Sequence, residues 1–176
     1  MFDTPFPYRK STYQKKQLGE DSYIEHVYTF RGKNNKRYLV FVEQYNYNVF
    51  AVKFCTHEKK NYIDRFNVLS HRFECNRILS TVGAIMREII NNNPYATFGF
   101  IGSPLPTEAK NNTKRFRLYS LVVEQVISPI LFEHRKSTNN STYLMLNKDN
   151  MAQEPDLLIK IEVMFNELYL MDSEHI

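Results

Sequence analysis

The chain of 176 residues has no tryptophan, only two cysteines and only five glycines. Cys55 and Cys75 are too few to form a zinc site by themselves, and a single disulfide is not expected in a reducing compartment. No apolar run approaches the roughly 18 residues of a membrane-spanning helix. The first residues also lack the basic and then apolar order of a signal peptide. We therefore expect a cytoplasmic protein that does not enter a membrane.

Motifs that hold cofactors or metals are also missing. The chain contains neither the G-x-x-x-x-G-K-S/T nor the G-x-G-x-x-G pattern of phosphate-binding loops. Its five histidines have no metal-ligand spacing, and its carboxylates are scattered. Cys75 and His71 could be a nucleophile and its base, but no oxyanion-hole pattern accompanies them, which favours a small buried thiol. We expect no catalytic residue, no metal and no cofactor.

The chain does contain enough apolar material for one core. Apolar residues make up 43% and aromatic residues 14% of a length that one domain normally fills. The net charge of +4 is unevenly distributed, because residues 1–147 carry 21 basic against 12 acidic side chains and residues 148–176 carry 2 against 7. A basic body with an acidic end could attract a polyanion, neutralise its own field, or be an ordinary solvated surface.

The pattern along the chain predicts an α+β fold with a single mixed β-sheet. Residues 1–20 contain two prolines and two basic clusters without apolar periodicity, so we expect a flexible N-terminal arm before one domain over residues 21–176. Segments rich in β-branched and aromatic residues and bounded by turn residues predict six strands. They are Tyr23–Phe30, Tyr38–Glu43, Val49–Cys55, Ala96–Ile101, Ile130–His134 and Thr142–Leu146.

Apolar residues at intervals of three and four predict three helices that cover the sheet, at residues 76–91, 113–127 and 155–171. The strand Ala96–Ile101 lies between the first two helices, which is typical of a sheet that is parallel in part. The first three strands should form an antiparallel meander at one edge. The side chains expected to be buried are Val52, Phe54, Ile85, Ile89, Phe98, Phe100, Val122 and Leu158.

This order of elements resembles the core of the acetyl-CoA-dependent N-acetyltransferase superfamily. The run TKRFRLY, which ends at Tyr119, is similar to the stretch in which that family places small or basic residues before a Leu-Tyr pair. The family's Gly-rich pyrophosphate loop has no counterpart, because His71–Arg77 contains no glycine, and the family's helical pair between the first two strands is also missing. Side chains with a Cβ obstruct the approach of a pyrophosphate to the backbone, so we expect acetyl-CoA to bind weakly or not at all.

A second resemblance covers roughly residues 60–146. It rests on Thr81-Val82-x-x-Ile85, Asn93-Pro94-Tyr95-Ala96, Gly102-Ser103 and the run Lys114–Tyr119. These segments are similar to groups of small uncharacterised bacterial proteins of unknown function. The resemblance implies one compact domain and carries no activity.

The segment from Gly102 to Arg117 is the most informative for function. Basic residues crowd the predicted start of the second helix, where acidic residues are usually found. A bound anion would offset this repulsion, with Thr113 or Asn112 as the N-cap. The candidate anion-binding residues are Ser103, Thr113, Lys114, Arg115, Arg117 and Tyr119.

The same residues also have structural interpretations. The three cations could pair with Glu108, with Glu124 or with the acidic C-terminal segment. Tyr119 could stack on a nucleic-acid base or pack in the core, since it lies on the apolar face of the predicted helix.

Three functions follow from these patterns. The leading hypothesis is a non-catalytic binding module that presents the basic helix start to an anionic partner, either nucleic acid or an acidic protein. The alternatives are a divergent acyl-CoA-dependent N-acyltransferase-like enzyme and a protein-interaction subunit such as an inhibitor or antitoxin. Steep salt dependence would indicate nucleic acid, and stabilisation by acetyl-CoA would indicate the enzyme.

Overall fold

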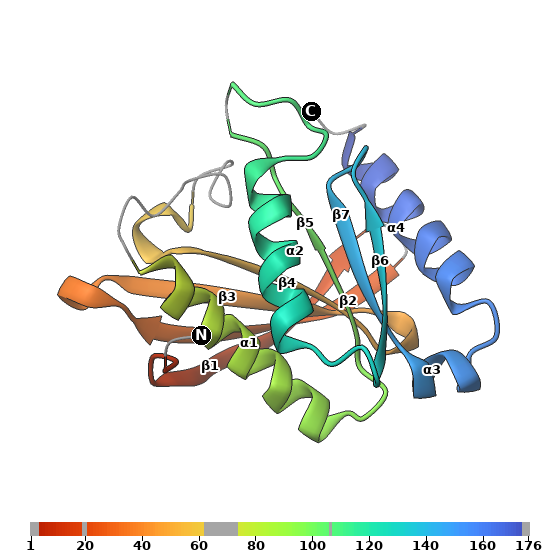
Figure 1. The fold of residues 1–176 in the computed structure, drawn as a ribbon, viewed down its shortest axis with the longest axis horizontal. Helices are drawn as coiled ribbons and strands as arrows, with labels where there is room; N and C mark the ends of the chain where they lie inside the picture. The colour runs from red at the N-terminus through yellow and green to blue at the C-terminus, as the bar shows by residue number, and fades with distance from the viewer. Residues whose placement is uncertain (1–3, 19–20, 62–73, 106, 174–176) are drawn as a thin grey trace.

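The computed structural model describes residues 4–18, 21–61, 74–105 and 107–173. Within these residues the chain forms one seven-stranded sheet with helices on both faces (Figure 1). The α+β class, the single domain and the mixed sheet predicted from the sequence are confirmed.

The strands follow a simple topology. Their order in the sheet is β1-β2-β3-β4-β5-β7-β6, and every neighbouring pair is antiparallel except β4 and β5, which are parallel. The strands are β1 (Tyr8–Leu18), β2 (Asp21–Arg31), β3 (Arg37–Gln44), β4 (Val49–Thr56), β5 (Thr97–Ile101), β6 (Phe132–Ser137) and β7 (Thr142–Asn147).

Four α-helices are described: α1 (Cys75–Asn92), α2 (Lys114–Val126), α3 (Lys148–Gln153) and α4 (Leu157–Ser173). Successive strand residues point to opposite faces of the sheet, and this alternation separates two clusters of the core. Phe50 belongs to the cluster that α1 and α2 cover, whereas its neighbour Val49 belongs to the cluster that α4 covers. Helix α1 is the crossover between the parallel strands β4 and β5.

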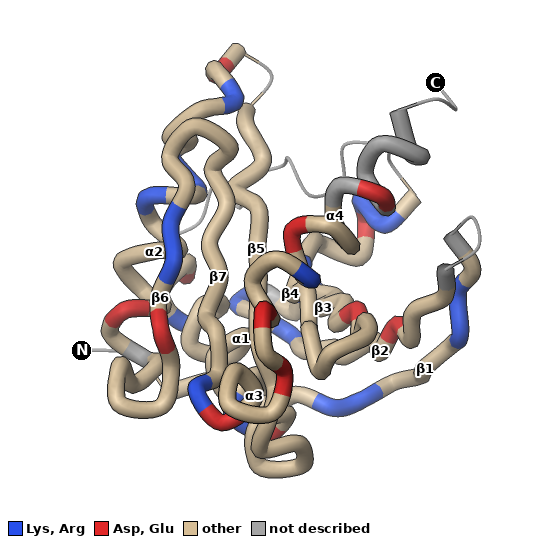
Figure 2. The backbone as a smooth tube through the Cα atoms, turned by 90° about the vertical axis from the view of Figure 1, so that its right-hand side faces the viewer, with Lys and Arg blue, Asp and Glu red and all other residues tan. Residues whose placement is uncertain are grey.

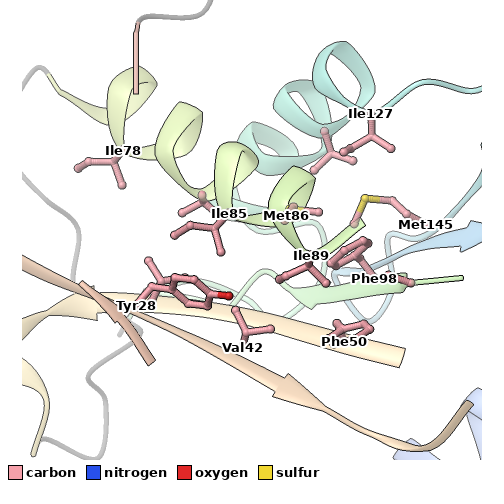
Figure 3. Close-up of a cluster of buried hydrophobic side chains, with 14 of the residues drawn as sticks. Tyr28, Val42, Phe50, Ile78, Ile85, Met86, Ile89, Phe98, Ile127 and Met145 are labelled. Carbon is pink, nitrogen blue, oxygen red and sulfur yellow. The ribbon is translucent and has the colours of Figure 1, made fainter. Parts of the chain in front are cut away.

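The larger cluster forms under α1. Figure 3 shows Ile78, Ile85, Met86 and Ile89 of this helix facing side chains of the sheet. The partners come from distant strands, with Tyr28 and Val42 from β2 and β3 and with Phe98 and Met145 from β5 and β7. The spacing of three and four residues in α1 is the periodicity that predicts this helix from the sequence.

The flexible arm predicted for residues 1–20 is wrong for the part that the structure describes. Residues Tyr8–Leu18 form β1, which pairs with β2 from Tyr8 opposite Phe30 to Leu18 opposite Asp21. Ahead of β1, the Phe6 backbone N–H donates a 2.9 Å hydrogen bond to the Thr81 hydroxyl of α1. The sequence does not predict this strand. β1 is an edge strand that is exposed on most of its length, so it needs no alternation of apolar and polar residues.

The last helix also differs from the prediction. The helix predicted at 155–171 is found as α4, shifted by two residues, and the short helix α3 before it was not predicted; Asp156, with a positive φ of 62°, lies between the two. The Asn147 side chain caps α3 by accepting hydrogen bonds from the backbone N–H groups of Asp149 and Asn150.

Three of the eight side chains expected in the core are buried, namely Ile85, Ile89 and Phe98. The other five are only partly buried, and they are Val52, Phe54, Phe100, Val122 and Leu158. All five line one cleft, which accounts for their apolar character without full burial.

Charged residues mark the two edges of the sheet. Figure 2 shows basic segments along β1 and along β6, the strands that have a neighbour on one side only. Charged side chains on an edge strand oppose its pairing with another chain. None of the described helices is long and apolar enough to cross a membrane.

Candidate ligand-binding cleft

The cleft begins where the parallel strands separate. β4 and β5 pair over only three residue pairs, Val49–Ala51 with Thr97–Gly99. β4 then continues to Thr56 and β5 to Ile101, and no described strand pairs with β4 on this side beyond Ala51. The space between and beside the separated strands has a volume of about 920 Å³. This is in the range of pockets that hold small molecules and cofactors.

The walls of the cleft are mostly apolar and come from both faces of the sheet. On the face of α1 and α2 they include Leu79, Val82 and Met86 of α1 together with Val122 and Val123 of α2. On the opposite face they include Leu158, Ile161 and Phe165 of α4. The polar and charged residues of the wall are Lys53, Ser103, Arg115, Arg135, Lys136, Ser137, Asn140, Thr142 and Glu162, together with the Tyr119 hydroxyl.

Arg115 is the charged group that the fold buries most deeply in this wall. Its side chain is only 4% exposed. The guanidinium Nη1 donates a 3.0 Å hydrogen bond to the Ser103 backbone carbonyl, which ties the first turn of α2 to the end of β5. The Nη2 atom is buried and has no hydrogen-bond partner among the described residues.

Tyr119 lies one turn further along α2, between the separated strands. Its ring is 5.7 Å from the Phe54 ring of β4 and 5.8 Å from the Phe100 ring of β5, measured between centroids. Burial raises the pKa of Tyr119 to about 12, although the neighbouring Arg115 acts in the opposite direction. The hydroxyl therefore stays protonated at neutral pH and can donate a hydrogen bond to a group in the cleft.

The start of α2 is fixed by Thr113, one of the two N-caps expected from the sequence. The Thr113 hydroxyl accepts a hydrogen bond from the Phe116 N–H at 3.1 Å and donates one to the Gly102 carbonyl at 2.6 Å. A Cβ on Gly102 would lie 2.5 Å from the Phe116 backbone nitrogen, so only glycine allows this approach of loop and helix.

An anion already faces the first turn of α2, and it belongs to the chain itself. The Glu108 carboxylate accepts hydrogen bonds from the backbone N–H groups of Lys114 at 2.6 Å and of Leu105 at 3.1 Å. These two hydrogen bonds, together with the nearby cations Lys114 and Arg117, hold the pKa of Glu108 below its ordinary value. Glu108 therefore compensates the positive charge of this helix start through backbone N–H groups, and no ion pair between its carboxylate and a basic side chain of α2 is found among the described residues.

The three cations that the sequence groups together point to different places. Arg115 lies in the cleft wall, whereas Lys114 and Arg117 are exposed. The Arg117 guanidinium donates to the Asn112 backbone carbonyl. Of the six predicted anion-binding residues, the structure brings together Ser103, Arg115 and Tyr119 at the cleft, while Thr113 is buried as the cap.

The pair of Cys75 and His71 does not gain support as a catalytic unit. Burial raises the pKa of the Cys75 thiol, which disfavours the thiolate form that a nucleophile requires. His71, like most of the glycine-free stretch before α1, lies outside the described residues. In the described part of the chain, no group of three or more His, Cys, Asp or Glu side chains is arranged to hold a metal ion.

Comparisons with models of known protein families, with curated proteins and with solved structures gave no match for this chain. The structure by itself assigns the protein to the α+β class, with one mixed sheet.

Proposed function

We propose that the protein binds an acyl thioester in the cleft between β4 and β5 and transfers its acyl group to an amine. The observation that carries this proposal is the early separation of the only parallel strand pair in the described sheet, which opens the cleft of about 920 Å³. The order of helices and strands, which resembles that of N-acetyltransferases in the sequence, supports the same proposal.

The separated strands suit an extended ligand with amide groups. Beyond Ala51 the edge of β4 that is turned towards β5 no longer pairs with that strand, and side chains of both strands line the cleft there. A pantetheine chain has two amides and a narrow apolar outline, so it could lie along this edge as a strand would.

The reaction would need little from the protein beyond positioning. The amine nitrogen attacks the thioester carbonyl, a C–N bond forms, the C–S bond breaks, the amine loses a proton to solvent and the thiolate takes one up. Tyr119 has a pKa of about 12, which is higher than that of a thiol, so its hydroxyl would stabilise the leaving sulfur by donating a hydrogen bond rather than by giving up its proton.

In this proposal the protein recognises the acyl donor by its pantetheine arm and not by its nucleotide. The stretch His71–Arg77 has no glycine that would admit a pyrophosphate to the backbone. We therefore expect S-acetylpantetheine to bind about as tightly as acetyl-CoA, and acetyl-CoA to gain little from its nucleotide.

The test is calorimetric titration of S-acetylpantetheine and acetyl-CoA into the protein and into two variants of α2. Val122→Trp places a large side chain in the cleft, whereas Leu121→Trp adds the same side chain on the outer face, where Leu121 is 59% exposed. Binding that is lost in Val122→Trp and kept in Leu121→Trp supports the proposal. The absence of binding to both thioesters at millimolar concentration would overturn it.

A second candidate function is supported by the exposure of Lys114 and Arg117. Both side chains remain in solvent at the start of α2, close to the exposed Lys110. They could contact a nucleic-acid backbone or an acidic protein surface, as the sequence suggests. The intramolecular Glu108 contact weakens this candidate, because the helix start does not need an external anion.

A further inference from the structure

Arg115 is an unusual group for the wall of an apolar cleft. A buried guanidinium normally has its N–H groups paired with carboxylates or carbonyl oxygens, because an unpaired buried charge is costly. Here the side chain is 96% buried, Nη1 reaches the Ser103 carbonyl, and Nη2 has no hydrogen-bond partner among the described residues. The Arg115 side chain takes part in no ion pair described for this structure.

No described acidic side chain forms an ion pair with Arg115, and Glu162, the carboxylate of the cleft wall, is exposed on α4. Glu108 binds backbone N–H groups of Lys114 and Leu105, and Glu124 forms an ion pair with Lys136. The Tyr119 hydroxyl is neutral at physiological pH. The structure thus holds a buried positive charge whose remaining N–H donors have no anionic partner in the described chain.

We propose that Arg115 binds the carboxylate of a substrate whose body is apolar. The inference rests on the proposed function, because it concerns the same cleft. A guanidinium recognises carboxylates through charge-assisted hydrogen bonds. Leu79, Val82 and Val122, which line the same cleft as Arg115, offer the substrate body apolar contacts. The site therefore selects a small amphipathic acid over both a neutral analogue and a polar anion.

The carboxylate can come from two parts of the reaction. It can belong to the acyl group, as in the monoester of a dicarboxylic acid with a thiol, or to the amine that accepts the acyl group. Both sources place the same group on Arg115. Titrations of S-succinylpantetheine and S-acetylpantetheine separate the two, because only the first carries a carboxylate on the acyl chain.

The primary experiment uses octanoate and octanamide as probes, since they share an apolar body and differ in charge. By calorimetry the wild type should bind octanoate at least tenfold more tightly than octanamide. Arg115→Met removes the charge and retains the length of the side chain, so it should abolish this difference. Arg117→Met removes an exposed arginine of the same helix and should leave the difference unchanged. Equal binding of the two probes to the wild type, or octanoate binding unaffected by Arg115→Met, would overturn the proposal.

A second measurement does not depend on the folding of a variant. In protein labelled with ¹⁵N-arginine, octanoate should shift the side-chain resonance of one arginine that Arg117→Met does not remove, and octanamide should not shift it. The absence of any octanoate-specific shift would contradict the inference even if Arg115→Met failed to fold.

The outcomes also separate this inference from the proposed function. Octanoate binding that depends on Arg115, without binding of any thioester, would retain the carboxylate site and overturn acyl transfer. Thioester binding without discrimination between octanoate and octanamide would retain the cleft and overturn the role of Arg115. Tighter binding of S-succinylpantetheine than of S-acetylpantetheine by tenfold or more assigns the carboxylate to the acyl group, and equal binding assigns it to the acceptor.

Discussion

Glu108 shows how a single side chain can compensate a row of like charges. The partial positive charge at a helix start makes the positions of Lys114 and Arg117 unfavourable. The Glu108 carboxylate, which lies in the preceding loop, offsets this repulsion. Because Glu108 lies at the surface and is partly exposed, the net gain is small and depends on its ionisation.

This dependence gives a pH prediction for Glu108→Gln, which removes the charge but keeps an acceptor oxygen. A carboxyl whose pKa is lower in the folded state than in the unfolded state stabilises the fold above its ordinary pKa, and this contribution is lost as the pH falls through the lowered value. The variant should therefore have a lower Tm than the wild type at pH 7, and the difference should shrink as the pH falls below 4.5. Thermal unfolding by circular dichroism between pH 7 and pH 3 measures it.

The exposed Glu167→Gln serves as the control, because Glu167 lies on α4, away from the start of α2. A Glu108→Gln difference that does not change with pH, or that equals the control, would show that the carboxylate contributes no charge interaction there.

At the residue scale the sequence predicts the cap but not the directions of the cations. Thr113 is recognisable as an N-cap from its type and position. Helical geometry separates residues 115 and 117 by roughly 200° around the axis, whereas 115 and 119 share a face. That spacing places Arg115 with Tyr119 and Val122 on the inner side, and it was the signal available in the sequence for a cleft residue.

At the scale of elements, the contact between Gly102 and Phe116 sets where α2 begins. In Gly102→Ala the new methyl group would meet backbone atoms of Phe116 at 2.5 to 2.6 Å, and backbone cannot move aside as a flexible side chain can. We expect a loss of about 1–3 kcal/mol in the free energy of unfolding, the usual cost of overpacking. Urea unfolding measures the loss.

The matched control for this variant is Ser103→Ala, which keeps the backbone carbonyl that accepts from Arg115. It should change the stability by less than about 0.5 kcal/mol, as substitutions away from buried features usually do. If Gly102→Ala were as stable as Ser103→Ala, the close approach of loop and helix would be wrong.

The packing of α1 against the sheet gives another prediction at this scale. Ile85 is fully buried in the cluster between α1 and the sheet. Ile85→Ala should therefore lower the free energy of unfolding by about 2–5 kcal/mol. Ile159→Ala on α4 is the control, because Ile159 is 59% exposed and its truncation should cost little. Equal losses in the two variants, measured by urea unfolding, would contradict the assignment of Ile85 to the core.

Elements with a buried face were predictable from the sequence, and elements without one were not. α1 and β5 carry apolar residues at helical and strand spacing, and both are found within one residue of the predicted bounds. β1 has Tyr13 exposed at 70% and basic residues along its length, so no alternation marks it. The cleft could not be predicted from the sequence. It depends on where β4 and β5 separate in space, and its partly buried apolar residues look like core residues in the sequence.

At the scale of the whole molecule, the burial of Arg115 changes what the basic surface can contribute to binding. Of the three cations at the start of α2, only Lys114 and Arg117 can reach a nucleic-acid backbone. If the protein binds nucleic acid there, replacing both by Ala should reduce the slope of log affinity against log salt by about two units. Fluorescence anisotropy with a labelled oligonucleotide at several salt concentrations measures the slope. An unchanged slope would exclude this surface as the contact.

The short ladder between β4 and β5 also determines how the sheet comes together and comes apart. The strands β1 to β4 are neighbours both in the sequence and in the sheet, whereas the three residue pairs between β4 and β5 require closure of the long crossover that contains α1. The contact between β4 and β5 should therefore form late in folding and open early in unfolding. Helix α1 packs on strands from both sides of this contact. A molecule bound in the cleft would contact both β4 and β5. Ligand binding should therefore slow the separation of these strands, so that β1 to β4 and the strands β5, β7 and β6 unfold together.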